Sequence, residues 1–337
     1  IRLSLVGSEM CIRDSHCIDQ LLGKGYAVRT TIRSESRIDE IKKAMNQYPN
    51  LDQNLEFHIC DLLEDSGWEE AVHGCEYVLH VASPFILEVP NDEDVLIRPA
   101  VDGTLRVLKA CSRSNVKKVV LTSSVAAVAY GHEKSKIYDE SDWSNTGEDS
   151  GITPYAKSKT LAEKAAWDFL DNLDSEKKFD FTVINPVGVF GPMLTSDIGT
   201  SNSLVSKLIN GELPACPATH MGYVDVRDVA KAHIFSMLNK STNDKRIIVS
   251  ESEMFFVDVG RILNDAGFKK SPTKQMPNWL VKILAIFVKE LSGVTKSLGK
   301  RVDTDKSRAK SLFDWDYISA KDSIVDTANQ LSAMDKK

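Results

Sequence analysis

Tyr155 and Lys159 are the pair of residues in this chain whose types and spacing point most directly to chemistry. The stretch from Leu161 to Leu170 repeats apolar residues at helical spacing, and positions i and i+4 of a helix share one face. An ammonium group roughly 4 Å from a phenol favours the phenolate by up to about 4 kcal/mol at an effective dielectric of ~20. The pair is therefore a candidate for general acid–base catalysis, with a solvated face of an amphipathic helix as the alternative.

A second set of polar residues follows a predicted buried strand. Residues 119–121 are three consecutive aliphatic side chains, as in parallel strands that are covered on both faces. Ser123 and Ser124 come directly after them. Because open α/β sheets bind their ligands at the carboxyl ends of the strands, we expect these serines to face a ligand site.

Strand-end serines followed about thirty residues later by Pro-Tyr-x-x-x-Lys resemble the short-chain dehydrogenase/reductase superfamily. Residues 15 to about 250 resemble its extended branch, the dihydroflavonol-reductase-like and aldehyde-reductase-like group, which lies in the NAD-dependent epimerase/dehydratase superfamily. The resemblance implies that Ser124 holds the substrate oxygen and that Tyr155 moves the proton. It implies that Lys159 lowers the pKa of the tyrosine and holds the cofactor ribose.

The same resemblance implies an α/β fold, a Rossmann-like doubly wound parallel sheet with a smaller C-terminal substrate lobe. A chain of 337 residues is long enough for both parts. We expect residues 1–185 to form the NADP-binding Rossmann domain and residues 186–337 mainly the substrate-binding lobe. Strands near 220–224 and 246–250 are expected to return to the core, and Asp225 is expected to cap the helix that follows.

The first turn of the chain departs from the resemblance. A dinucleotide fold needs glycines after its first strand, because they let the backbone approach the pyrophosphate. The family pattern puts them at positions 8, 11 and 14, where this chain has Ser8, Cys11 and Asp14. A carboxylate at position 14 would repel a pyrophosphate.

Two explanations fit this departure: a degenerate cofactor loop, or a segment 1–14 that is not native to the protein. Residues 3–14 resemble translated sequencing-adapter read-through, and the chain begins without methionine. We favour the second explanation and assign no cofactor role to this segment. The activity of the chain as it stands is in question for the same reason.

The end of the second predicted strand, residues 26–32, indicates which dinucleotide is bound. NAD enzymes usually place a carboxylate there for the ribose, whereas NADP enzymes place an arginine near the 2′-phosphate. This chain has Arg33, and a guanidinium can grip a phosphate with two hydrogen bonds. We therefore predict NADP (NADPH) rather than NAD. The alternative is a solvated arginine at the start of a helix.

The resemblance places further residues along the cofactor. Asp61 and Leu62 would border the adenine, although a helix cap explains Asp61 equally well. Ala82 and Ser83 would contact the ribose or a phosphate, and Pro186 would lie beside the nicotinamide. We interpret His80, on the preceding strand, as a packed residue and not as a catalyst.

The substrate class is predicted from one position of the site at which this chain differs from plant dihydroflavonol reductases. Plant dihydroflavonol reductases carry Asn or Asp five residues after the catalytic serine, and this chain has Ala129 there. A small or apolar aldehyde or ketone is therefore favoured over a polyphenol, with Ser124 on its oxygen and with Phe85 and Leu204 in the pocket wall. The predicted reaction is reduction of this carbonyl by hydride transfer from NADPH, with Tyr155 as the proton donor.

Two other functions stay open. A sugar-nucleotide epimerase or dehydratase shares the fold and the Ser/Tyr/Lys set but recycles a tightly held NAD, which Arg33 disfavours. A catalytically silent NADP-sensing protein fits the altered residues 7–14 but not the intact Ser124, Tyr155 and Lys159.

The amino-acid composition indicates which classes of partner and which cellular compartment to expect. The net charge of −6 argues against binding to nucleic acid or to an anionic membrane. The six cysteines lack paired spacing, so we expect neither a zinc site nor disulfides. Reduced thiols and the lack of a recognisable signal peptide favour a cytoplasmic protein. We expect a monomer or homodimer. The most apolar run, residues 279–288, is too short to span a bilayer and is interpreted as a core-facing or lobe helix.

Overall fold

Parallel strands form the central layer of the computed structural model, which describes residues 2–6, 12–82 and 92–334. Within these ranges seven strands pair in the order β10-β7-β5-β4-β1-β2-β3. Their bounds are β1 Arg2–Val6, β2 Ala27–Ile32, β3 Leu55–Ile59, β4 Tyr77–His80, β5 Lys118–Thr122, β7 Asp180–Pro186 and β10 Lys245–Val249. This order is the Rossmann-like doubly wound sheet that the sequence predicted.

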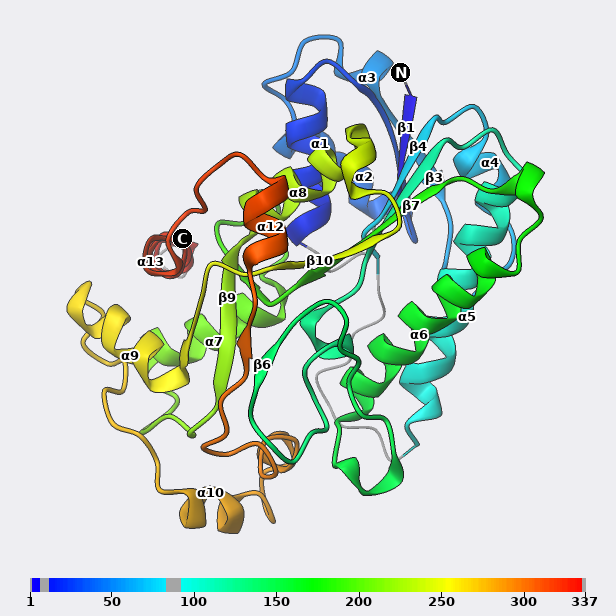
Figure 1. Cartoon of the computed structure of the whole chain (residues 1–337). Coiled ribbons are helices and arrows are strands. Elements are labelled where there is room, and N and C mark those ends of the chain that lie inside the picture. Colours follow the sequence, from blue (N-terminus) through cyan, green and yellow to red (C-terminus); the bar gives the residue numbers. More distant parts are fainter. Residues whose placement is uncertain (1, 7–11, 83–91, 335–337) are drawn as a thin grey trace.

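Helices cover both faces of this sheet (Figure 1). Helices α1 and α8 pack on one face, around Ile18 and Val229, and helices α4, α5 and α6 pack on the other, around Val107 and Ala166. The bounds are α1 Ile12–Gly23, α2 Ile38–Ala44, α3 Leu51–Asn54, α4 Trp68–Val72, α5 Asp94–Ser112, α6 Pro154–Asp171 and α8 Val226–Leu238. Because both faces are covered, strands such as β5 are buried at every position.

Strand β1 lies at the centre of the sheet, between β2 and β4. Helix α1 starts at Ile12, three residues before the predicted start near Ser15, so Asp14 lies in its first turn. Positions 8 and 11 of the predicted glycine turn lie outside the described residues. The foreign origin of segment 1–14 stays a prediction.

The smaller lobe is built on a second sheet, with strands in the order β11-β9-β8. The rings of Phe190 and Tyr223 stack in its core with their centroids 5.1 Å apart. Its elements are β8 Gly188–Phe190, β9 His220–Asp225, β11 Ser252–Phe255, α7 Gly199–Asn210, α9 Phe256–Asp265, α10 Asn278–Leu284, α11 Lys289–Ser292 and α13 Ala320–Met334. Helix α12 Ser307–Leu312 packs on β10 of the central sheet instead. Strand β10 joins the central sheet as predicted, whereas the strand predicted near 220–224 is β9 and belongs to this second sheet, because it pairs with β8 and β11.

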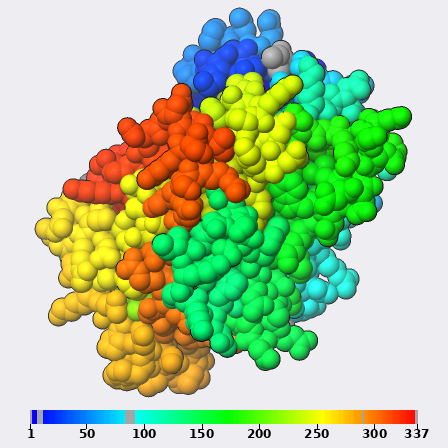
Figure 2. Space-filling view, viewed as in Figure 1, coloured from blue at the N-terminus to red at the C-terminus, as the bar shows by residue number. Residues whose placement is uncertain are grey.

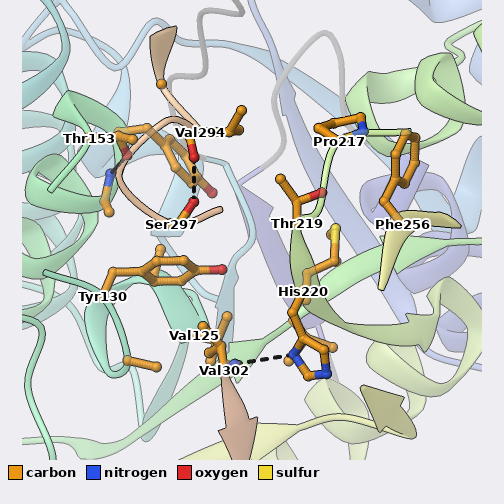
Figure 3. A pocket seen from close by; sticks show the side chains of 18 of the residues that line it. Val125, Tyr130, Thr153, Pro217, Thr219, His220, Phe256, Val294, Ser297 and Val302 are labelled. Atoms are coloured by element: carbon orange, nitrogen blue, oxygen red, sulfur yellow. Dashed lines mark hydrogen bonds between the residues drawn. The ribbon is translucent and has the colours of Figure 1, made fainter. Parts of the chain in front are cut away.

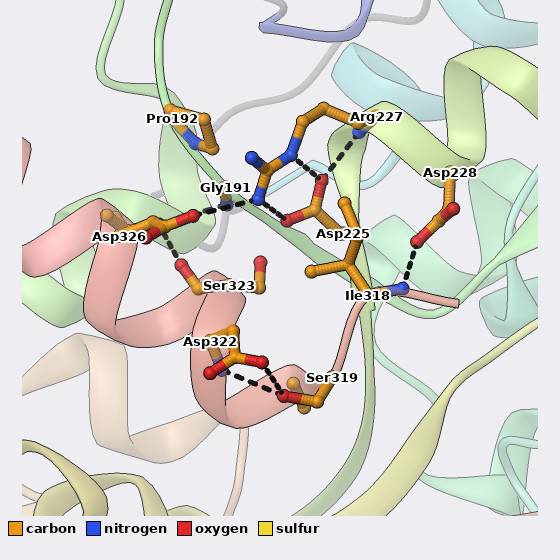
Figure 4. A network of polar contacts seen from close by, with 12 residues as sticks. Gly191, Pro192, Asp225, Arg227, Asp228, Ile318, Ser319, Asp322, Ser323 and Asp326 are labelled. Atoms are coloured by element: carbon orange, nitrogen blue, oxygen red, sulfur yellow. Dashed lines mark hydrogen bonds and ion pairs between the residues drawn. The ribbon is translucent and has the colours of Figure 1, made fainter. Parts of the chain in front are cut away.

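An ion-pair network ties the lobe to the central domain (Figure 4). Asp225 caps α8 by accepting a hydrogen bond from the backbone N–H of Arg227 at 2.8 Å, which confirms the predicted cap. The Arg227 guanidinium donates to both carboxylate oxygens of Asp225 and reaches Asp326 of α13 at 3.0 Å. Helix α13 is thereby fixed against the start of α8.

Two further short strands, β6 Ile137–Tyr138 and β12 Asp303–Thr304, pair in parallel. They join the loop that precedes α6 to the segment that follows α11. No helix within the described ranges combines the length and the apolar character needed to cross a bilayer.

Candidate active site

Helix α6 presents Tyr155 and Lys159 to the same space. Its first turn is fixed by Thr153, whose hydroxyl accepts a hydrogen bond from the backbone N–H of Ala156 at 3.2 Å, and by Pro154 at the first helical position. Tyr155 is half-buried, and the buried Lys159 places its ammonium nitrogen 5.8 Å from the centroid of the tyrosine ring. The predicted shared face is therefore observed.

Ser124 lies just beyond the end of β5. It caps the short 3-10 helix Val125–Ala127, and its Oγ accepts a hydrogen bond from the backbone N–H of Ala126 at 3.1 Å. An accepted bond leaves the hydroxyl proton of the serine to be donated to a ligand oxygen.

One cavity of about 840 Å³ is lined by six of the twelve residues predicted for the site. Its walls are largely apolar and come from the strand ends of the central sheet, from α6 and from the lobe (Figure 3). The predicted residues that line it are Ser124, Ala129, Tyr155, Lys159, Pro186 and Leu204. The three side chains predicted for catalysis thus surround a single space beside the residues predicted for the substrate.

Tyr130 and His220 also line the cavity, and sequence reasoning missed both. The Tyr130 hydroxyl points into the cavity in Figure 3. Burial, with a smaller contribution from nearby Tyr155, raises the pKa of Tyr130 to about 12, so its phenol stays neutral. The sequence held one signal for Tyr130: it directly follows Ala129, a predicted substrate residue, in the segment after β5, which we call the serine strand because Ser123 and Ser124 follow it.

His220 of β9 lies on the lobe side of the cavity, as Figure 3 shows. Its Nδ1 accepts a hydrogen bond from the backbone N–H of Val302 at 3.1 Å, which puts the proton of the neutral ring on Nε2. Burial lowers the pKa of His220 below its ordinary value. The sequence around it gives no signal for this position, because β9 is distant in the chain from Tyr155.

A buried ion pair supports the serine strand from behind. Glu163 lies one turn after Lys159 on α6 and pairs with Arg246 of β10. Its other carboxylate oxygen accepts hydrogen bonds from the hydroxyl of Ser123 and, at 2.7 Å, from the side-chain amide of Asn185. The same amide donates to the backbone carbonyl of Ser124 at 3.2 Å, so α6, β7 and β10 jointly fix the end of β5.

The predicted adenosine end of the cleft is arranged along the ends of β2, β3 and β4. Arg33 is exposed directly after β2, and Ala82 is buried after β4. The Asp61 carboxylate accepts a hydrogen bond from the backbone N–H of Leu63 at 2.9 Å. The helix-cap alternative for Asp61 is therefore wrong, because α4 begins later and is preceded by Gly67.

Leu62 packs against α5, where Gly103 leaves room for it: a Cβ atom at Gly103 would lie 3.0 Å from the Cβ of Leu62. The predicted contacts of Ser83 and Phe85 lie outside the described residues. His80 is 1% exposed, and burial followed by the nearby charge of Lys159 lowers its pKa to about 3. It is a packed, neutral residue, as predicted.

The residues fit a nicotinamide dinucleotide at its two ends better than in its middle. The cavity around Tyr155, Lys159 and Pro186 suits a ribose and an uncharged ring, and Arg33 supplies a cation at the opposite end. Between them the first turn of α1 carries Asp14, which is buried. A carboxylate there opposes a pyrophosphate at the helix N-terminus, where the helix dipole alone would attract it.

The parallel sheet and the serine, tyrosine and lysine around one cavity at its carboxyl edge define the extended short-chain dehydrogenase/reductase class. The chain belongs to the NAD dependent epimerase/dehydratase family, whose model matches residues 15–250.

Within this family, the chain is similar to several reductases of known sequence or structure. The chain is 33% identical to the NADPH-dependent methylglyoxal reductase GRE2 of Saccharomyces cerevisiae, with 94% of each protein covered. It is 35% identical to a cinnamoyl-CoA reductase of Medicago truncatula, over 81% of this chain and 84% of that protein. The crystal structure of the yeast methylglyoxal/isovaleraldehyde reductase Gre2 in complex with NADPH superposes with a TM-score of 0.81 at 29% identity, covering 100% of this chain and 99% of that one.

Proposed function

We propose that this protein is an NADPH-dependent reductase of small or apolar aldehydes and ketones. The observation that carries the proposal is the single cavity in which Ser124, Tyr155 and Lys159 meet beside a largely apolar wall. The comparisons named above support it, because yeast Gre2 is named as an NADPH-dependent reductase of methylglyoxal and its crystal structure is a complex with NADPH.

The mechanism assigns one task to each side chain. NADPH, when bound, supplies the hydride that the carbonyl carbon receives. The Ser124 hydroxyl donates a hydrogen bond to the carbonyl oxygen and orients it. Tyr155 gives its phenolic proton to the same oxygen, so that an alcohol leaves the site. The buried ammonium of Lys159 stabilises the phenolate that remains on Tyr155.

The choice of substrate rests on the wall of the cavity. Ala129 is 3% exposed and offers no hydrogen bond to a substrate hydroxyl, and Leu204 adds another aliphatic surface. A polyhydroxylated substrate would leave its hydroxyl groups without partners at these positions, which costs binding energy. Apolar carbonyl compounds have no such requirement.

NADPH consumption against a panel of carbonyl compounds tests the proposal. We expect branched aliphatic and aromatic aldehydes to react with a kcat/KM at least about ten-fold above that of polyhydroxylated ketones. Ala129→Asn should narrow this ratio, and Leu238→Ser, an exposed residue at the end of α8, serves as the control. If a protein with glycine at positions 8, 11 and 14 binds NADPH and turns over no carbonyl compound, the proposal fails.

A catalytically silent NADP-sensing protein is the second candidate, because Asp14 stands where the family has a glycine and weaker binding of the cofactor would count against turnover. It predicts that NADPH binds and that no carbonyl compound is reduced. Titration of NADPH by its fluorescence, combined with the same panel, separates the two functions.

We also propose that the protein acts in the cytoplasm as a monomer or homodimer. We propose a small-molecule substrate as its partner. We also propose that a cofactor domain extends to residue 185 and that the lobe follows it. The cavity supports this division, because Tyr155 and Lys159 reach it from one side and Leu204 from the other.

A further inference from the structure

The segment between α9 and β12, residues 266–302, differs from the rest of the chain in charge. It contains eight lysines and arginines and a single acidic residue, a net charge of +7 in a protein whose total is −6. Lys274, Lys282 and Lys300 are exposed, and within the described part of the chain no carboxylate forms an ion pair with them. The acidic total therefore conceals a strongly basic local surface.

The same segment exposes large apolar side chains at helical spacing. Trp279, Ile283, Ile286 and Phe287 are 64%, 48%, 77% and 81% exposed. Backbone hydrogen bonds of helical type continue beyond α10, from Ala285 to Val281 and from the following residues to their own preceding turn. The four side chains thus share one outward side of a short helical hairpin. Of the two predicted alternatives, a core-facing helix or a lobe helix, the structure has the lobe helix α10, in which only the opposite side of the run is covered.

The covered side of this hairpin forms part of the cavity wall. Leu284, Leu291 and Val294 line the cavity, and Val281 is fully buried. In Figures 1 and 2 the segment forms the lower end of the molecule, below the second sheet. One short stretch of chain therefore separates the cavity from an exposed apolar and basic surface.

We propose that the exposed side of this segment, with the apolar Trp279, Ile283, Ile286 and Phe287 and with Lys274, Lys282 and Lys300 of the same segment, docks the protein on an anionic phospholipid bilayer. Exposed aromatic and aliphatic side chains beside lysines are the composition that inserts into the interface of such a bilayer. A second copy of the chain fits poorly, because an isologous dimer would bring two segments of charge +7 together. A nucleic acid would leave the four apolar side chains without a contact.

Docking would bring the cavity wall to the membrane interface, where apolar carbonyl compounds partition. This consequence rests on the proposed function, whereas the docking itself does not. The test therefore measures binding and not turnover, and its failure leaves the reductase proposal standing.

The experiment is flotation of the purified full chain with vesicles of phosphatidylcholine alone, or of phosphatidylcholine with about one third phosphatidylserine. We expect binding to the anionic vesicles only, weakening as salt is added. Trp279→Ser with Phe287→Ser should weaken it at least about ten-fold through lost apolar burial. Lys274→Glu with Lys282→Glu should weaken it by a similar factor through reversed charge.

Matched controls place the same changes elsewhere on the surface. Leu238→Ser with Met334→Ser removes two exposed apolar side chains, and Lys24→Glu with Lys240→Glu reverses two exposed charges. Both controls should bind like the parent. Quenching of tryptophan fluorescence by brominated lipid, measured on the unaltered protein and again after Trp279→Phe, reports insertion without relying on a destabilising variant.

Three outcomes would overturn the proposal. The first is absence of binding to anionic vesicles at low salt. The second is equal loss of binding in the control variants. The third is a change from dimer to monomer in sedimentation velocity when Phe287 is replaced, which would assign the surface to a second copy of this chain.

Discussion

The two ends of the predicted cofactor cleft differ in how well they suit their ligand. At the chemical end, α6 and the end of β5 place Ser124, Tyr155 and Lys159 around one cavity, supported by the buried pair of Glu163 and Arg246. At the phosphate end, the first turn of α1 carries the carboxylate of Asp14 instead of a glycine. We therefore expect catalytic geometry and cofactor affinity to be separable in this protein, so that each can be changed without the other.

The largest effect is expected at the chemical end. Tyr155→Phe removes the phenolic proton and keeps the ring, so kcat should fall about 1,000-fold because general acid catalysis is lost. NADPH affinity should change by less than about three-fold, as the phosphate contacts are untouched. Single-turnover NADPH oxidation and a fluorescence titration measure the two quantities.

Tyr26→Phe, at a half-buried position outside the cavity, is the matched control and should keep full activity. Retention of more than about a tenth of the parental kcat by Tyr155→Phe would contradict the assigned role of the phenol.

Substitutions at the phosphate end should change NADPH affinity and leave kcat almost unchanged. Replacing Ser8, Cys11 and Asp14 together by glycine removes a negative charge and three Cβ atoms from the predicted path of the pyrophosphate. We expect NADPH to bind at least about ten-fold more tightly, with kcat changed much less than affinity. Isothermal titration measures the affinity.

Asp14→Asn isolates the charge from the steric contribution and should recover part of the gain. If neither protein binds NADPH more tightly than the parent, the Asp14 carboxylate does not face the pyrophosphate, and the contrast between the two ends is lost.

Arg33, further along the same cleft, is predicted to set the preference for NADPH over NADH. Arg33→Ser should weaken NADPH about ten-fold and leave NADH almost unchanged, because only the 2′-phosphate loses a charged partner. The ratio of kcat/KM for the two cofactors measures this. Arg98→Ser, an exposed arginine on α5, should leave the ratio as it is. Equal weakening of both cofactors would assign Arg33 a structural role.

The smallest effect concerns α8, which packs beside α1 and so supports the phosphate end. Burial raises the pKa of Asp228 to about 6, from an ordinary value of 3.8. The folded protein therefore binds this proton more tightly than the unfolded chain, so the contribution of Asp228 to stability falls as pH rises from about 4 to about 6. Its carboxylate accepts a hydrogen bond from the backbone N–H of Ile318 at 2.7 Å, visible in Figure 4.

Asp228→Asn keeps this acceptor and removes the charge. We expect its melting temperature at pH 7.5 to exceed that of the parent by about 2 °C, and we expect the difference to vanish near pH 4. Calorimetry at both pH values checks this. A variant that is less stable at pH 7.5 would show that the buried carboxylate is stabilised by its surroundings.

Local patterns in the sequence predicted more of the site than of its surroundings. The shared face of Tyr155 and Lys159 and the cap formed by Asp225 follow from residues a few positions apart, and the structure has both. The position of His220 beside Val302 and the pairing of Glu163 with Arg246 join segments that are far apart in the sequence and meet only in the folded protein. No spacing in the sequence carries that information.

The exposure of residues 279–288 was not predicted, for a different reason. An apolar run of this length is usually buried, and the sequence alone does not distinguish a helix that is covered on both sides from one that is covered on one. Val281 is buried, whereas Phe287 is among the most exposed apolar residues of the described chain. The basic residues around the run were the signal to consider, and the acidic total charge concealed it.

The pairing of Glu163 with Arg246 has a consequence for biosynthesis. Arg246 is made 83 residues after Glu163, so a chain emerging from the ribosome completes Tyr155 and Lys159 well before the cation that neutralises the neighbouring carboxylate. Until β10 has been translated and docked, Glu163 lacks this cationic partner, and an unpaired buried carboxylate is costly. We therefore expect the end of β5 to become ordered only after the edge strand β10 has been made, and a chain truncated before Arg246 to leave this site unassembled.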